Sequence, residues 1–304
     1  MISIVADSLT SRGANFSFIS LHDLPGTVRI RFDASGQADA FLHEGEPMFD
    51  LQEVRAIYHR VGFANFEVYQ EYTPEEVRYV NNECGMALNG WLNNFPHLVV
   101  NRPWASGSNA SKPFQIAQIK EHGFRVPRTI VTNLPNSARV FYEENKGQVI
   151  YKSISYLRSV VNKMTEADLD RLDTLDVSPI QLQEYVRGFD VRVHVIGDAH
   201  LYAARIDSSE SDYRYDKTSE MSPYEVDDDL AEKCVAVTKA LGLEMSGIDL
   251  RVTPEGEVFC FEVNPSPAFR FYESRAGLPI SDCLAEYLED YDREHAREPA
   301  GMAG

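Results

Sequence analysis

The sequence has few cysteines, and none of them is placed for a metal site or a disulfide framework. The four cysteines, Cys84, Cys234, Cys260 and Cys283, are far apart and form no CxxC pair or Cys/His cluster. Zinc sites need closely spaced thiolate and imidazole ligands, and disulfide-stapled domains are small and rich in cysteine, so both classes are excluded. All four have apolar neighbours, which predicts buried thiols.

Long apolar runs and blocks of basic residues are also lacking. No stretch approaches the ~18 consecutive apolar residues of a membrane span, and Asp7 falls where a signal peptide needs a basic and then an apolar run. Lys and Arg total 29 against 47 Asp and Glu, a net charge of −18, and no basic block could follow a phosphate backbone or an anionic lipid surface. We therefore expect a cytoplasmic protein with neither nucleic acid nor membrane as a partner.

The remaining composition is that of a globular chain. With 43% hydrophobic and 25% charged residues, 18 Gly and 15 Pro, collagen-like and mainly disordered classes are excluded. At about 150 residues per domain, 304 residues suggest two domains.

Secondary-structure signals divide the chain into an α/β beginning and a strand-rich remainder. The runs 2–6 and 54–62 are predicted strands, and a helix over 73–93 begins with a capping box formed by Thr73 and Glu76. A strand ending at Asn101 precedes a Ser/Gly/Asn loop over 105–111. Further helices are predicted over 112–122, 136–145, 227–241 and 280–295. Further strands are predicted over 129–133, 148–154 and 182–186, with hairpins over 190–206 and 246–264.

The last hairpin carries the most informative pattern. If its connection is Thr253–Gly256, cross-strand partners sum to 509 and Asp249 faces Cys260. Alternation then predicts an apolar face of Ile248, Leu250, Val252, Phe259, Phe261 and Val263. The opposite face would hold Asp249, Cys260, Glu262 and Asn264.

Two carboxylates and an amide oxygen on one strand face indicate a cation site. Asp249 and Glu262 would repel each other without a cation, and hard oxygen ligands suit Mg²⁺. An open site of three ligands implies a nucleotide, because Mg²⁺ shares phosphate oxygens. Pro265 to Pro267 would fix the strand end beside Asn264. The alternative, ordinary polar positions on a solvent face, stays open.

Single cations interrupt the β-rich runs. These are Lys152, Arg192, Arg205 and Arg251. Each fits a phosphate ligand; the alternative is a solvent-facing side chain for Lys152 and a structural salt-bridge partner for each arginine.

Together these motifs resemble the ATP-grasp superfamily, in particular RimK-like ligases and the enzymes that install ester or amide cross-links in graspetides such as microviridins. The resemblance runs from about residue 98 to 290 and is carried by SNASKPFQIAQIKEHGFRVPRT, VIYKS, QEYVRGFDVRVHVIGD, SDYR, GIDLRV and FCFEVNPSP. It implies an α/β (α+β) chain with the ATP-grasp fold, whose two lobes clamp ATP. The implied parts are a pre-ATP-grasp α/β domain (1–104), a central lid subdomain (105–186), a C-terminal lobe (187–295) and a flexible tail (296–304).

The resemblance also implies a role for each matching residue. The implied nucleotide ligands are Lys112, Lys152, Glu184, Tyr185, Val186, Asp190 and Arg214. The implied metal ligands are Asp249, Glu262 and Asn264. The implied catalytic residues, facing the γ-phosphate or an acyl phosphate, are Lys152, Arg192 and Arg205. Among the nucleotide ligands, the lysines would bind phosphates, Glu184 and the two following backbone units the adenine, and Asp190 the ribose.

The chain departs from the family pattern at two places. No glycine-rich loop follows Lys152, where Ser153, Ser155 and Arg158 are expected to form a lid instead. Asp216 stands where the family has an asparagine after the arginine of SDYR.

The implied activity is ATP-dependent ligation of a carboxylate to an amine or a hydroxyl through an acyl phosphate, releasing ADP and phosphate. The expected cofactors are ATP and two Mg²⁺ ions, with Mn²⁺ as an alternative. The expected substrate is a carboxylate-bearing peptide, held by local arginines such as Arg60, Arg158, Arg270 or Arg275. A homodimer or a tetramer is left open. Two alternatives also stay open: a ligase for small amino acids or dipeptides, like glutathione or D-alanine ligases, and a non-catalytic ATP-binding module.

Overall fold

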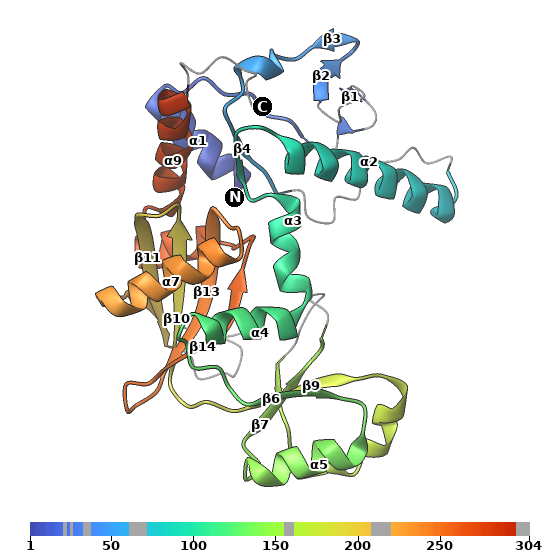
Figure 1. Ribbon diagram of the computed structural model, residues 1–304, viewed down its shortest axis with the longest axis vertical. Coiled ribbons are helices and arrows are strands. Elements are labelled where there is room, and N and C mark those ends of the chain that lie inside the picture. The colour runs from blue at the N-terminus through green and yellow to red at the C-terminus, as the bar shows by residue number, and fades with distance from the viewer. Residues whose placement is uncertain are drawn as a thin grey trace. The chain divides into compact units, whose positions relative to one another are not determined.

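The computed structural model describes residues 1–20, 23–24, 27–32, 38–60, 72–154, 161–207 and 220–295 (Figure 1). It contains two compact units. One comprises Met1–Ser106, Gly242–Met245 and Pro279–Gly304, and the other comprises Gly107–Leu241 and Ser246–Leu278. No helix in the described ranges has the length and apolar character needed to cross a membrane.

In its described part, the first unit combines helices with two small sheets. Its longer helices are α1 (Ile2–Arg12), α2 (Pro74–Asn94) and α9 (Ile280–His295), and its short ones are η2 (Leu51–Glu53) and α3 (Pro103–Ser106). The antiparallel sheet has the order β1 (Val28–Phe32), β2 (Ala38–His43), β3 (Glu46–Pro47), and the parallel pair is β4 (Ala56–Tyr58) with β5 (Leu98–Val100). The rings of Phe41 and Trp91 pack edge to face in the core, with their centroids 4.8 Å apart.

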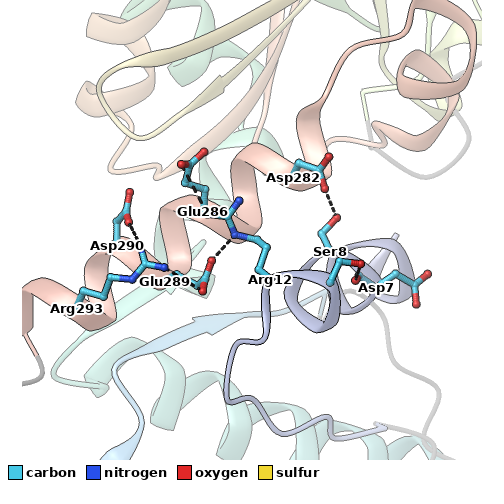
Figure 2. A network of polar contacts seen from close by, with 9 residues as sticks. Asp7, Ser8, Arg12, Asp282, Glu286, Glu289, Asp290 and Arg293 are labelled. Atoms are coloured by element: carbon cyan, nitrogen blue, oxygen red, sulfur yellow. Dashed lines mark hydrogen bonds and ion pairs between the residues drawn. The ribbon is translucent and has the colours of Figure 1, made fainter.

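The start of the chain is helical, so the predicted strand over 2–6 is wrong. Helix α1 lies beside α9, as Figures 1 and 2 show. The Ser8 hydroxyl donates to Asp282 at 2.6 Å, and Arg12 forms ion pairs with Glu286, at 3.6 Å, and with Glu289. A short apolar run does not distinguish a strand from a helix by itself. The partner helix decides, because it takes up the face of α1 that buries Ser8.

Helix α2 confirms the predicted capping box. The Thr73 backbone N–H donates to Glu76 Oε2 at 2.7 Å, and the Glu76 N–H donates to Thr73 Oγ1 at 3.3 Å. At the other end, Arg102 donates to the carbonyls of Leu92 and Asn93 at 3.1 and 2.8 Å. Arg102 thereby satisfies carbonyl groups that the helix itself leaves without partners.

Within the described residues, the second unit is built on two antiparallel sheets. The larger has the order β12 (Glu220–Pro223), β11 (His200–Asp207), β10 (Phe189–Ile196), β13 (Met245–Val252), β14 (Val258–Asn264). The smaller has the order β6 (Thr129–Thr132), β9 (Ile180–Glu184), β7 (Val149–Lys152), β8 (Asn162–Lys163). The helical elements are η3 (Gly107–Ala110), α4 (Lys112–Glu121), α5 (Pro135–Glu144), α6 (Glu166–Leu169), η4 (Leu172–Val177), α7 (Asp228–Ala240) and α8 (Arg270–Ala276). Phe141, Val149 and Leu182 belong to the core of the smaller sheet.

Strand β14 is the border of the larger sheet, and side-chain and backbone groups close that border. Gln115 of α4, only 3% exposed, donates to the carbonyl of Val263 at 2.7 Å and accepts from its N–H at 3.1 Å. Further along the strand, the Cys260 N–H donates to the Arg125 carbonyl at 2.8 Å. These backbone groups of the border strand are therefore bonded inside the unit.

Most of the predicted elements are confirmed to within two residues. Strand β4 is shorter than the predicted run 54–62, of which residues 61 and 62 lie outside the described ranges. The predicted loop 105–111 differs: α3 and η3 occupy most of it, because Pro103 presets the first helical turn and Asn93 Oδ1 accepts the Trp104 N–H at 2.9 Å.

The domain limits 1–104, 105–186, 187–295 and 296–304 stay predictions. The compact units divide the chain after Ser106 and give α9 to the first unit, because it contacts α1 and β4.

Candidate functional site

The hairpin of β13 and β14 brings two carboxylates face to face. Asp249 pairs directly with Glu262, and Gly247 pairs with Asn264. The register shifts beyond Asp249, so that Leu250 pairs with Cys260. The predicted register, with Asp249 opposite Cys260, is wrong because the connection runs from Thr253 to Glu257 and a bulge interrupts the ladder.

The predicted carboxylate face is nevertheless confirmed. Cross-strand partners share a face, so Asp249, Glu262 and Asn264 project to the same side. Cys260 was predicted on this face but instead lies opposite Leu250, on the apolar face. Cys260 is 1% exposed, and burial raises the pKa of its thiol well above the usual range. Phe259, predicted on the apolar face, pairs with Arg251.

Arg192 of β10 reaches the carboxylate face and binds Asp249. Its Nη1 lies 2.5 Å from Asp249 Oδ1, and its side chain is 6% exposed. Glycine at 247 makes this approach possible, since a Cβ there would lie 2.3 Å from Arg192 Nη2. Burial raises the pKa of Asp249, Arg192 opposes that rise, and the charges of Glu262 and Asp190 add to it.

Glu262 is held by groups at both carboxylate oxygens. Asn109 Nδ2 donates to Oε1 at 2.8 Å, and Lys112 Nζ lies 3.9 Å from Oε2. Burial alone would raise the pKa of Glu262, but Lys112, the Asn109 hydrogen bond, Lys152 and Arg192 outweigh it and hold the pKa below its ordinary value. The surroundings of Glu262 thus favour its charged form, whereas burial works against the charged form of Asp249.

The structure brings five of the predicted residues into one electrostatic cluster: Lys112, Lys152, Arg192, Asp249 and Glu262. Lys152, at the end of β7, lies 3.5 Å from Gln183 Oε1. Asn264 Oδ1 accepts the Ser266 N–H at 2.9 Å, which fixes its amide at the strand end.

The predicted adenine and ribose ligands are engaged with protein groups. Arg251 binds both carboxylate oxygens of Asp190, at 2.7 and 2.9 Å, and donates to the Val186 carbonyl at 3.1 Å. The N–H groups of Glu184 and Tyr185 donate to backbone carbonyls, both at 2.9 Å. The roles of these residues toward a nucleotide stay predictions, and Arg251 is a salt-bridge partner, one of the two interpretations left open.

The structure does not bring Arg205 to this cluster. Val191 pairs with Arg205 and Arg192 pairs with Ala204, so the two arginines project from opposite faces of the sheet. Arg205 instead binds Asp207 through two hydrogen bonds of 2.8 Å and stacks 3.9 Å from the Phe189 ring. Arg205 therefore lies away from the carboxylate cluster, and its role toward a phosphate stays a prediction.

Other predicted residues lie outside the described residues. Arg214 and Asp216, and Ser155 and Arg158 of the expected lid, belong to this group.

The donor set fits a hard divalent cation with positions left for phosphate and water. No group of three or more His, Cys, Asp and Glu side chains gathers at metal spacing in the described ranges, so the candidate ligands are two carboxylates and an amide. Asn109, which donates a hydrogen bond to Glu262, is a residue of the cluster that the sequence did not predict. It stands in a Ser/Gly/Asn stretch whose composition indicates only a loop.

Comparison with known proteins places this cluster in a family. The model described as a RimK-like ATP-grasp domain matches residues 111–288. The structure of the ATP-grasp ligase PsnB complexed with minimal precursor is 27% identical, with a TM-score of 0.82, over 95% of this chain and 94% of that one. The macrocyclase MdnC of Microcystis aeruginosa MRC, bound with precursor peptide MdnA, is 21% identical with a TM-score of 0.83, over 95% of each chain, and shows the fold alone.

Named sequence relatives agree with the same family. The "Probable alpha-L-glutamate ligase 2" of Shewanella amazonensis is 30% identical over 115 residues, which is 36% of this chain and only 38% of that protein's length. The "Probable alpha-L-glutamate ligase" of Haemophilus ducreyi is 26% identical over 276 residues, 84% of each chain. The described structure has the mixed helix and sheet content of the ATP-grasp fold.

Proposed function

The chain belongs to the RimK-like ATP-grasp family, and we propose that it is an ATP-dependent ligase that activates a carboxylate of a peptide substrate. The likeness to PsnB supports a peptide substrate. PsnB is described in complex with a minimal precursor, and the similarity to it covers 95% of this chain. The net charge of −18 disfavours diffuse attraction of an acidic peptide, so local cations must hold its carboxylates.

One observation carries the proposal: Asp249 and Glu262 are direct cross-strand partners in contact with Arg192 and Lys112. We propose that Asp249, Glu262 and Asn264 hold Mg²⁺, which supplies charge neutralisation at the phosphates. The number of ions and the use of Mn²⁺ stay predictions. Likeness to PsnB, also described with Mg and ADP, supports the use of Mg²⁺.

The proposed reaction has two displacement steps. An oxygen of the substrate carboxylate attacks the γ-phosphorus of ATP, the bond to the bridging oxygen breaks, and ADP leaves an acyl phosphate behind. An amine or a hydroxyl then attacks the acyl carbon, loses its proton and expels phosphate, so that an amide or an ester forms.

The residues of the chain act by position and charge. Lys112 and Lys152 would neutralise the phosphates, and Arg192 would stabilise the negative charge of the transferred group. Arg192 also favours the ionised form of Asp249, since it opposes the rise in the pKa of that carboxyl that burial causes. No general base is needed in the first step, because the attacking carboxylate carries no proton.

A second candidate is a ligase that uses free amino acids. It is favoured by the alpha-L-glutamate ligase names of the relatives, one of which aligns with 84% of this chain. The two candidates share the ATP and metal chemistry and differ in the substrate that enters the site.

ADP release with two defined probes tests the proposal. Purified protein with ATP and Mg²⁺ is given either synthetic peptides that contain Asp, Glu, Lys and Thr or free L-glutamate, and hydroxylamine traps acyl phosphate as a hydroxamate. We expect ADP release, hydroxamate and peptide products that have lost one water. Activity with L-glutamate alone favours the second candidate. Binding of ADP with Mg²⁺ but no turnover with either probe contradicts both.

A further inference from the structure

Asn109 is placed to control the geometry of Glu262. It lies in η3, immediately before α4, and its Nδ2 donates to Glu262 Oε1 at 2.8 Å. Lys112, at the start of α4, approaches Oε2 to 3.9 Å. One short stretch of chain therefore orients both oxygens of a proposed metal ligand.

The amide of Asn109 has a second, unused end. Its Oδ1 is buried and has no hydrogen-bond partner among the described residues. The opposite orientation of the amide would set two acceptors against each other, so the contact with Glu262 fixes Nδ2 as the donor. A buried carbonyl oxygen without a partner costs free energy unless water or a ligand donates to it.

We propose that Asn109 is a positioning residue for the metal site. Its amide nitrogen fixes the rotamer of Glu262, and its Oδ1 accepts a hydrogen bond from a water molecule of the Mg²⁺ hydration shell. Mg²⁺ usually keeps several waters in protein sites, and outer groups that orient ligands affect metal affinity strongly. The inference rests on the proposed function, because it assumes Mg²⁺ bound with a nucleotide.

The test separates metal binding from nucleotide binding and from folding. The unfolding temperature of the wild type, Asn109→Ala and Asn109→Ser is measured with ADP while Mg²⁺ is titrated, and again with ADP and a chelator. Ser108→Ala is the matched control in the same turn, because the Ser108 hydroxyl, unlike the Asn109 amide, makes no hydrogen bond to Glu262 among the described residues. Without nucleotide, we expect all four proteins to unfold at similar temperatures.

The expected result is a selective loss of metal affinity. Both Asn109 variants should need about 10-fold or more Mg²⁺ for half of the ADP-dependent stabilisation, while stabilisation by ADP with chelator and the behaviour of Ser108→Ala stay unchanged. For turnover, the Mg²⁺ concentration at half-maximal rate should rise, and kcat should recover at saturating Mg²⁺.

Three outcomes decide the matter. Equal Mg²⁺ requirements in the wild type and both Asn109 variants overturn the inference. An equal loss of affinity for ADP with chelator also overturns it, because Asn109 would then contact the nucleotide. If the wild type itself shows no Mg²⁺-dependent stabilisation by ADP, the proposed function fails, and this inference, which rests on it, fails with it.

Discussion

Adding a single methyl group at Gly247 should disable the site from within. In Gly247→Ala the new Cβ would lie 2.3 Å from Arg192 Nη2 and 2.5 Å from Pro267 Cβ. The proline ring cannot rotate away, so the guanidinium must move or the strand must shift. Overpacking of this kind costs about 1–3 kcal/mol. Displacing Arg192 also breaks its ion pair with Asp249, whose side chain is 35% exposed, so water offsets much of that loss and about 1 kcal/mol is added.

We therefore expect the free energy of unfolding to fall by roughly 2–4 kcal/mol, measured by urea denaturation with a fluorescence readout. The variant should still fold but release little ADP. The pH dependence of the remaining ADP release should shift to higher pH. Arg192 opposes the burial that raises the pKa of Asp249; once it is displaced, this pKa rises further and activity is lost at a higher pH as the pH falls.

Two variants serve as controls. Gly85→Ala in α2 meets open space and should not lower stability. The cost of Gly247→Ala should shrink when Arg192→Met removes one of the two clashing groups, because neighbouring substitutions are not additive. Wild-type unfolding and ADP release in Gly247→Ala would refute the close approach of Arg192 and the reasoning built on it.

Glu262→Gln and Asn264→Ala should each abolish ADP release while circular dichroism and the unfolding temperature stay near those of the wild type; loss of folded protein instead would make these side chains structural. In Lys152→Met, steady-state kinetics should show slower turnover, equivalent to a loss of about 2–4 kcal/mol of transition-state stabilisation. The midpoint of urea denaturation should change little. In the native protein, iodoacetamide should label Cys84 before Cys260, because Cys84 is partly exposed whereas Cys260 is buried and its thiol pKa is strongly raised. Mass spectrometry of tryptic peptides measures the labelling of each thiol. Equal labelling of the two would contradict the described core.

The hairpin shows why a correct face was predicted from an incorrect register. The actual connection and the bulge each displace the pairing by one residue from the predicted sum of 509. Near Asp249 and Glu262 the two displacements add to two, which restores the parity, and the carboxylate face is right. Between the bulge and the turn only one displacement applies, so Cys260 and Phe259 fall on the faces opposite to those predicted. A bulge leaves no mark in alternation over so short a strand.

Other features depended on partners distant in the sequence. The first helix was mistaken for a strand because Asp282 and Glu286, which receive Ser8 and Arg12, follow almost the whole chain later. Arg205 was placed by resemblance, whereas strand pairing sets its face. The capping box of Thr73 and Glu76 was reliable, because that signal lies within one turn of a helix.

The bonded border of the larger sheet also bears on how the protein behaves at high concentration. An uncovered border strand is a template on which a strand of another molecule can add, and such pairing leads to aggregation. Here the strand that carries Glu262 and Asn264 is the border, and Gln115 occupies both backbone groups of Val263 between them. One amide side chain thus occupies the backbone groups that intermolecular strand addition would need beside the proposed metal ligands, so the same two hydrogen bonds oppose aggregation and hold the strand that carries those ligands.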